Sequence, residues 1–227
     1  MERPTFHEEL QLWRQGYKAV VGLDEVGRGA FAGPLVAAGV MFPAFFSETL
    51  PDKDAVLLLA SIRDSKQLTA LTRNRLAILI KEYAFCSSVV EISVSSINRF
   101  GVGKANRMAF RLVLNSLYRK LQEKGKNLFV LIDGFHVSYL KGGRKQQKAI
   151  VKGDQKSISI AAASILAKVY RDMLMDHVPP RYKKYKFSHH KGYGTAEHRK
   201  LIRRYGLSRL HRTSFNLGRF AAPLDKA

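Results

Sequence analysis

Four acidic side chains in this sequence are placed where a set of catalytic carboxylates could be held together. Asp24 and Glu25 end one apolar run, Asp133 ends another, and Asp154 follows a third, shorter apolar stretch. In open α/β sheets ligands gather beyond the carboxyl ends of the strands, so these acids are candidates to converge at one edge. For any one of them alone, a helix cap or a turn contact is the commoner role. The group is more informative, because so basic a chain contains few acids.

A cluster of carboxylates indicates metal-dependent phosphoryl transfer. Carboxylates that lie close together repel one another and stay ionised together only when cations neutralise them. Cys86 is the only cysteine, which excludes a multi-cysteine zinc site, and oxygen ligands favour Mg²⁺ or Mn²⁺. Two such ions about 3.5–4 Å apart can hold the attacking and the leaving oxygen of a phosphodiester. We therefore expect two divalent ions and a phosphate-containing substrate.

The net charge indicates which class of substrate this is. Lys and Arg total 39 against 18 for Asp and Glu, which gives a formal net charge of +21 at pH 7. So large an excess predicts a polyanionic partner. Nucleic acid is favoured over an anionic membrane surface, because the sequence lacks a basic amphipathic helix with an aromatic apolar face. Charge alone leaves open whether the protein only binds nucleic acid or also cleaves it.

A short loop, Gly27-Arg28-Gly29, comes directly after the first two acids. Glycines let the backbone approach a ligand closely and adopt positive φ, and a guanidinium can bind phosphate. By itself such a tripeptide is more often a simple tight turn. Its position beside Asp24 and Glu25 makes it a candidate substrate-binding loop.

The elements that must position these residues alternate between strand and helix. Short apolar runs without alternation are typical of strands covered on both faces, and apolar residues spaced by threes and fours predict helices. This pattern predicts an α/β layered domain with helices on both faces of the sheet. The run Ala161-Ala162-Ala163 suggests close approach of its helix to the sheet. The expected strands are residues 18–25, 35–42, 84–94, 127–133 and the shorter 148–154. The expected helices are residues 69–83, with Thr69 or Ser65 as the cap, 95–124, which Gly101 and Gly103 can interrupt near its start, 157–177 and 196–205.

Several motifs occur in order along most of the chain. They are GLDEVGRGAFAGP at 22–34, DSKQL at 64–68, IDG at 132–134, KGD at 152–154 with SIAAASILAK at 159–168, HKGYGT at 190–195 and HRTSF at 211–215. Together they resemble the motifs of the ribonuclease HII family over about residues 20–216. The sister family, ribonuclease HIII, typically carries Gly-Thr-Gly at the loop and a substantial N-terminal domain, so Arg28 and the short segment before the first strand favour ribonuclease HII.

The resemblance implies a fold and a role for each matching residue. The fold would be a ribonuclease H-like mixed sheet flanked by helices, in one domain over residues 1–227 with a catalytic core over about 18–178 and a small helical, basic extension over about 179–227. The Gly27-Arg28-Gly29 loop would contact the nucleic-acid backbone around a ribonucleotide and its 2′-hydroxyl, Lys66 would bind phosphate, and Tyr193 would pack against the sugar at the junction. The catalytic and metal-binding carboxylates would be Asp24, Glu25, Asp133 and Asp154.

The implied activity is hydrolysis of RNA in RNA/DNA hybrids and incision of DNA duplexes 5′ of embedded ribonucleotides by two metal ions, leaving a 3′-hydroxyl and a 5′-phosphate. Two alternatives stay open: a non-catalytic protein that binds hybrids or duplexes, and a related metal-dependent nuclease that acts on DNA junctions. We expect a cytoplasmic monomer without membrane association. Four histidines, His189, His190, His198 and His211, lack the spacing of a zinc motif and are expected to be exposed or satisfied within the protein.

Overall fold

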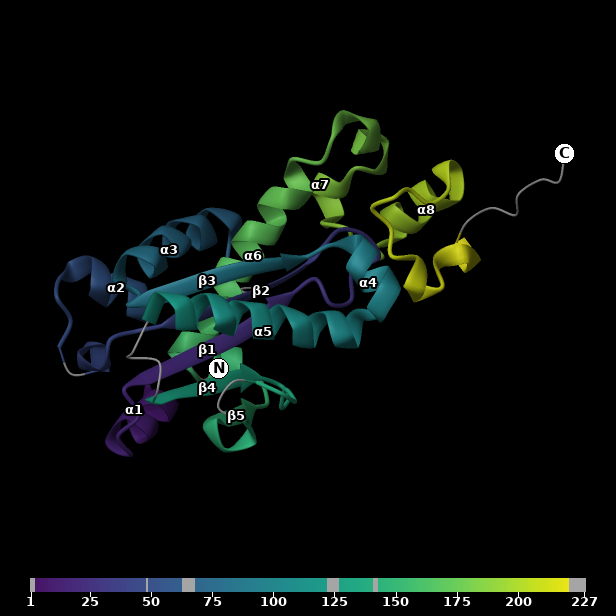
Figure 1. Cartoon of the computed structure of the whole chain (residues 1–227). Coiled ribbons are helices and arrows are strands. Elements are labelled where there is room, and N and C mark those ends of the chain that lie inside the picture. The colour runs from purple at the N-terminus through teal and green to yellow at the C-terminus, as the bar shows by residue number, and fades with distance from the viewer. Residues whose placement is uncertain (1–2, 48, 63–67, 122–126, 141–142, 221–227) are drawn as a thin grey trace, which may run out of the picture.

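A five-stranded sheet forms the centre of the computed structural model, which describes residues 3–47, 49–62, 68–121, 127–140 and 143–220 (Figure 1). Its strands are β1 (Ala19–Val26), β2 (Leu35–Met41), β3 (Cys86–Ile92), β4 (Leu128–Asp133) and β5 (Gln147–Ile150). They lie in the order β3-β2-β1-β4-β5. β2 is antiparallel to β1 and β3, whereas β1, β4 and β5 run parallel. The predicted mixed sheet is confirmed.

The register of β1 against β4 brings two of the predicted acids to the same edge. Leu23 lies opposite Ile132 in this parallel pair, so Asp24 and Asp133 follow at the same level. Leu23 and Ile132 are buried in one apolar cluster on one face of the sheet. Because successive side chains alternate between faces, Asp24 and Asp133 both turn toward the opposite face.

Two long helices cover the two faces of the sheet, as Figure 1 shows. Helix α5 (Val102–Leu121) packs on β2 and β3, and helix α6 (Ile158–Asp176) packs on β1 and β2. The backbone of α6 approaches β1 so closely that a Cβ on Gly22 would lie 2.2 Å from the carbonyl carbon of Ser159. All three alanines at 161–163 are fully buried, which confirms the predicted close approach.

The remaining helices agree in part with the sequence pattern. The predicted cap at Thr69 is confirmed, since its side-chain oxygen accepts a hydrogen bond from the N–H of Thr72. The expected helix over 95–124 is divided at Gly101, which has a φ of 77°. Two short N-terminal helices, α1 and α2, were not predicted. Besides α5, the α-helices and 3-10 helices that precede α6 are α1 (His7–Arg14), η1 (Ala44–Ser47), α2 (Lys53–Ser61), α3 (Ala70–Tyr83), α4 (Val94–Phe100), η4 (Arg144–Gln146) and η5 (Gly153–Gln155).

The C-terminal part of the chain consists of short helices that lie against the loop after β1. Ala32 and His211 form an isolated antiparallel bridge, and the N–H of Arg212 donates to the carbonyl of Phe31 over 2.8 Å. Within the described residues, no helix is long and apolar enough to cross a membrane. The elements are η6 (Pro180–Tyr185), α7 (Phe187–His190), α8 (Ala196–Tyr205), η7 (Thr213–Phe215) and η8 (Leu217–Phe220).

Candidate active site

Asp24 and Glu25 lie at the C-terminal end of β1, where the strand leaves the sheet. Asp24 is only 6% exposed, and its Oδ1 accepts a hydrogen bond from the N–H of Glu25 over 2.7 Å. The hydroxyl of Ser164 on α6 donates a further hydrogen bond to Asp24. A buried carboxylate is costly unless hydrogen bonds or cations compensate it, so this position favours a bound cation.

Asp133 and Asp154 come from neighbouring segments that are hydrogen-bonded to each other. Asp133 ends β4, and its Oδ1 accepts a hydrogen bond from the N–H of Gly153 over 2.7 Å. Gly153 starts the turn η5, which carries the buried Asp154. The strand expected over residues 148–154 is shorter than predicted, because β5 ends at Ile150. Lys152 has a left-handed backbone conformation and turns the chain, so that Asp154 reaches the site from a 3-10 turn.

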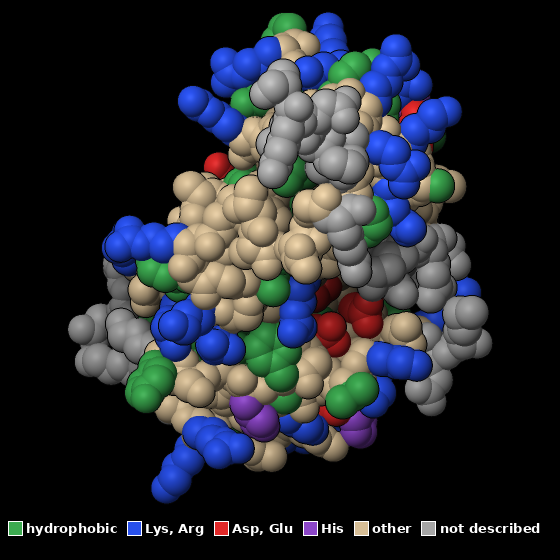
Figure 2. All heavy atoms as spheres, turned by 90° about the vertical axis from the view of Figure 1, so that its right-hand side faces the viewer, with side chains coloured by type: hydrophobic (Ala, Val, Ile, Leu, Met, Phe, Trp, Pro, Cys, Tyr) green, Lys and Arg blue, Asp and Glu red, His purple; other side chains and the backbone are tan. Residues whose placement is uncertain are grey.

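The four acids line one cleft of about 450 Å³. Figure 2 shows Asp and Glu side chains recessed in a hollow, with Lys and Arg side chains around it. The cleft brings together all four predicted carboxylates, the predicted loop and the predicted tyrosine. Its lining residues are Asp24, Glu25, Val26, Gly27, Arg28, Gly29, Asp133, Asp154, Ser164, Lys168 and Tyr193.

Burial and mutual repulsion raise the pKa values of the two acids on β1. The pKa of Asp24 lies well above its ordinary value, first because the carboxyl is buried and then because of the charges of Glu25 and Asp133. Burial also raises the pKa of Glu25 to about 7, while the nearby Arg28 guanidinium acts in the opposite direction. These carboxyls therefore resist full ionisation at neutral pH unless a cation joins them.

The donor set fits hard divalent cations. The Oε2 of Glu25 is buried and has no hydrogen-bond partner, so it is available as a ligand. Carboxylate oxygens that repel one another around a cleft are the ligands that Mg²⁺ and Mn²⁺ prefer. Within the described part of the chain, no three Asp, Glu, His or Cys side chains already form a closed metal site.

The loop Gly27-Arg28-Gly29 forms the wall next to Glu25. Gly27 has a φ of 92°, and a Cβ there would lie 2.2 Å from the Nε of Arg171. Arg28 Nη1 lies 3.8 Å from Glu25 Oε1, and 55% of the Arg28 side chain remains exposed. The guanidinium is thus free to leave this weak, partly solvated pair for a phosphate.

Two fully buried arginines hold the segment between β1 and β2, residues 27–34, by its backbone. Arg171 on α6 donates to the carbonyls of Pro34, Ala32 and Lys191. Arg212 donates to the carbonyls of Gly33, Arg28 and Pro34 over 3.0–3.1 Å. Burial first, and then the charge of the neighbouring Arg171, lower the pKa of Arg212 to about 9. A guanidinium has five N–H donors in a rigid fork, so each arginine can donate to several carbonyls that make no hydrogen bond within a strand or helix.

Tyr193 belongs to a segment that pairs with the same residues 27–34 between β1 and β2. The carbonyl of Gly192 accepts hydrogen bonds from the N–H groups of Phe31 and Ala32. The Arg171 guanidinium lies 5.2 Å from the centre of the Tyr193 ring. The arginine that holds the loop therefore also supports the ring on the other wall of the cleft.

Comparisons with known proteins agree with this arrangement of residues. A family model described as Ribonuclease HII matches residues 21–217. Ribonuclease HII of Herpetosiphon aurantiacus is 42% identical, over 92% of this chain and 94% of that protein. Ribonuclease HII of Chlorobium luteolum is 41% identical, over 96% of this chain and 97% of that protein.

The chain belongs to the ribonuclease HII family. It is accordingly an endoribonuclease. Among solved structures, ribonuclease H2 from Pyrococcus horikoshii is similar, with a TM-score of 0.65, 24% identity and coverage of 89% of this chain and 98% of that one. Bst-RNase HIII in complex with Mn²⁺ has a TM-score of 0.66 at 21% identity and covers 92% of this chain and 70% of that one, which shows the shared fold.

The ribonuclease HII resemblance found in the sequence is thus confirmed, but one predicted residue and two others need comment. Lys66 and most of its DSKQL motif lie outside the described residues, so the phosphate-binding role stays a prediction. Sequence reasoning missed Ser164 and Lys168, which both line the cleft from α6. Their spacing of four residues puts them on one helix face, and this was the signal that could have found them.

Two of the four histidines, His198 and His211, form a buried, neutral, hydrogen-bonded pair, and His190 is also buried, with its Nε2 2.9 Å from the carbonyl of Tyr185. His198 Nδ1 lies 2.9 Å from the carbonyl of Tyr193 and must donate to it, so its Nε2 accepts from the Nε2–H of His211 at 3.1 Å. His211 Nδ1 then accepts from the N–H of Ser208. Burial, the first cause for each, lowers the pKa values of His198 and His211 to about 4. They are satisfied within the protein, as the sequence analysis expected.

Proposed function

We propose that this chain cleaves the RNA strand of RNA/DNA hybrids and incises DNA duplexes on the 5′ side of an embedded ribonucleotide. The observation that carries the proposal is the single cleft in which four carboxylates face the Gly27–Gly29 loop and Tyr193. Its location in a chain of net charge +21 supports a nucleic-acid substrate. The products would be a 3′-hydroxyl and a 5′-phosphate.

The four acids would hold the metal ions that this chemistry requires. Two bound Mg²⁺ or Mn²⁺ ions would supply an activated water and stabilise the departing 3′-oxygen. Asp24 and Glu25 would contribute from β1 and Asp133 from β4, while η5 presents Asp154. The hydrogen bonds from Ser164 to Asp24 and from Gly153 to Asp133 would keep these carboxylates oriented before metal binds.

Recognition of the ribonucleotide would fall to the loop and to Tyr193. Backbone groups of Gly27 and Gly29 can approach the sugar, because neither residue has a side chain, and Arg28 can contact phosphate. The 2′-hydroxyl distinguishes RNA from DNA, so a wall that contacts it directly beside the acids couples recognition to cleavage. The ring of Tyr193 would pack against the sugar on the 3′ side of the junction. Lys66 would bind phosphate.

The rest of the chain would serve as a basic platform for the duplex. We propose that residues 1–227 act as one domain and as a monomer, with the basic extension over about 179–227 docked on the core. The bridge between Ala32 and His211 supports this arrangement, because it ties the extension to the segment that directly follows the substrate-binding loop.

Incubation with a labelled DNA duplex that holds one ribonucleotide, with and without Mg²⁺, tests the proposed function. Metal-dependent incision on the 5′ side of the ribonucleotide is the expected result. Tight binding without any cleavage would instead identify a non-catalytic binding protein. Cleavage of an all-DNA junction, with the ribonucleotide duplex left intact, would identify a junction nuclease.

A further inference from the structure

One row of polar side chains on α6 continues the cleft away from the four acids. Ser164, Lys168 and Asp172 are four residues apart and therefore lie on one face of the helix. Ser164 and Lys168 line the cleft, and Asp172 lies one turn further along. Lys168 is thus a cation on the wall of a cleft that four carboxylates share.

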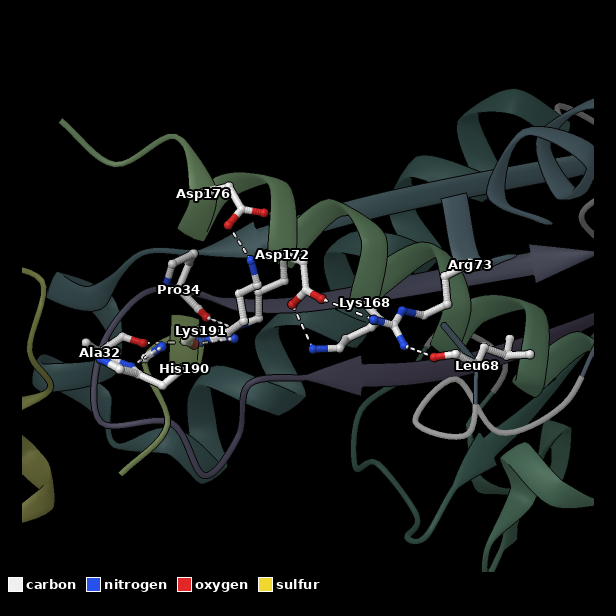
Figure 3. A network of polar contacts seen from close by, with 11 residues as sticks. Ala32, Pro34, Leu68, Arg73, Lys168, Asp172, Asp176, His190 and Lys191 are labelled. Carbon is white, nitrogen blue, oxygen red and sulfur yellow. Dashed lines mark hydrogen bonds and ion pairs between the residues drawn. The ribbon is translucent and has the colours of Figure 1, made fainter. Parts of the chain in front are cut away.

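The ammonium of Lys168 is paired with an acid that does not line the cleft. Its Nζ lies 2.7 Å from Asp172 Oδ1, and each of the two side chains is only 17% exposed. On the other side, Arg73 of α3 places its Nη2 3.7 Å from Asp172 Oδ2. Arg73 also donates to the carbonyl of Leu68 over 2.5 Å. Figure 3 shows this row from Lys168 through Asp172 and Arg73 to Leu68.

This arrangement places a positive charge beside the acids without neutralising them. A lysine free to move in such a cleft would be drawn to the carboxylates and would compete with divalent cations. Asp172 holds the ammonium back, and Arg73 in turn fixes Asp172 from a second helix. The ammonium therefore stays at the wall of the cleft, where it can donate to an oxygen of a nucleic-acid backbone.

We propose that Lys168 contacts a substrate phosphate next to the acid cluster, and that Asp172 and Arg73 are the positioning residues that hold it there. This inference rests on the proposed function, because it assumes that a nucleic-acid backbone occupies the cleft. A purely structural pair between α6 and α3 is the alternative, and it predicts an effect on stability without any effect on phosphate recognition.

The salt dependence of binding separates these two roles. Lys168→Met keeps the packing of the aliphatic stem and removes the charge. Binding of a duplex with one ribonucleotide is measured in EDTA over a series of KCl concentrations. Loss of one phosphate contact should lower the slope of log K against log salt by about 0.9 and weaken binding on the order of tenfold. Lys168→Arg should restore most of the salt slope and most of the affinity.

Lys120→Met is the matched control. Lys120 also makes one specific contact, to the carbonyl of Ser87, but Ser87 lies opposite Val40, away from the cleft end of the sheet. This variant should retain the wild-type salt slope. Equal slopes for the wild type, Lys120→Met and Lys168→Met would overturn the proposal, whatever Lys168→Met does to stability.

A neutral phosphate analogue locates the contact. Methylphosphonate linkages are placed one at a time at the phosphates that flank the ribonucleotide. At one of these positions the methylphosphonate should weaken binding by the wild-type protein. The same methylphosphonate should cause no further loss of binding in Lys168→Met, which already lacks the contact. If every position weakens both proteins equally, Lys168 contacts none of these phosphates and the proposal is wrong.

The positioning role of Asp172 has a readout that does not depend on activity. In Asp172→Asn the released ammonium moves toward the acids, so the rise in melting temperature caused by Mn²⁺ alone should require several-fold more Mn²⁺. The double variant Lys168→Met with Asp172→Asn should recover the wild-type response. An Asp172→Asn protein with the wild-type response would refute this role.

The proposed function and the role of Lys168 can fail separately. A wild-type chain that binds the duplex but never cleaves it would disprove the proposed function. The salt dependence of binding would still show whether Lys168 contacts a phosphate.

Discussion

The backbone N–H of Gly153 donates a hydrogen bond to Asp133 Oδ1 over 2.7 Å and so links two of the four acids of the cleft. Asp133 ends β4, whereas Gly153 begins the turn that presents Asp154. One carboxylate therefore has two tasks: it faces the cleft, and it fixes the turn that carries its neighbour. Substitutions that keep or remove the acceptor atom separate these tasks.

Asp133→Asn should abolish turnover and leave the fold and duplex binding largely unchanged. Asparagine keeps an oxygen that can accept from Gly153 but loses the charge that a divalent ion requires. Asp133→Ala should also lose turnover and in addition lose about 1 kcal/mol of unfolding free energy, because the N–H of Gly153 loses its partner. Urea unfolding beside a cleavage assay measures both. Normal cleavage by Asp133→Asn would show that the third acid is assigned wrongly.

Gly27→Ala should destabilise the protein, whereas Gly29→Ala should not. At Gly27 a Cβ meets both a positive φ and the buried Arg171, at a cost on the order of 1–3 kcal/mol. At Gly29 a Cβ would meet open space, so stability should stay the same while substrate affinity falls. Thermal unfolding and duplex binding of the two variants give the comparison. Equal stability of both variants would contradict the packing of Arg171 under this loop.

Arg212→Lys should destabilise the protein by on the order of 2–4 kcal/mol although it conserves charge. Lysine cannot reproduce the three hydrogen bonds to the carbonyls of Gly33, Arg28 and Pro34. The same exchange at the exposed Arg203 is the control and should change the unfolding free energy by less than about 0.5 kcal/mol. Similar urea midpoints for the two variants would mean that Arg212 does not hold the loop.

Acidification from pH 6.5 to pH 4 should destabilise the protein through its buried histidines. The pKa of His211 is about 4 in the folded protein, below its ordinary 6.5, so the unfolded chain binds more protons in this window and stability falls as pH falls. The wild type should lose up to about 3 kcal/mol more than His211→Gln across the window. Asp24 and Glu25, whose raised pKa values act in the opposite direction, are present in both proteins and cancel. A pH dependence that is the same in both would refute the buried neutral state.

The acids at the ends of β1 and β4 could be predicted because a buried strand and the residue that follows it are recognised from a short stretch of sequence. Short apolar runs made β1 and β4 recognisable, and an acid at the end of each pointed to one edge. Asp154 was harder to place, because the strand before it ends at Ile150 and the left-handed Lys152 redirects the chain.

Residues that depend on distant partners could not be predicted. Nothing in the sequence distinguishes Arg171 and Arg212 from the many other basic residues of the chain, yet both are fully buried. Their burial is possible only because carbonyls of the loop after β1 accept their hydrogen bonds, and this pairing joins segments more than a hundred residues apart. The role of Lys168 likewise depends on which face of α6 meets the sheet edge, and spacing alone does not reveal this.

Mapping the cut on a duplex with a single ribonucleotide tests the central claim most directly. The ribonucleotide is placed at two different positions of one labelled strand, and the ends of the products are identified with Mg²⁺ or with EDTA. We predict that the cut moves with the ribonucleotide, always on its 5′ side, leaves a 3′-hydroxyl and requires both metal and Asp133. A cut that stays fixed when the ribonucleotide moves, or that persists in EDTA, would contradict the account.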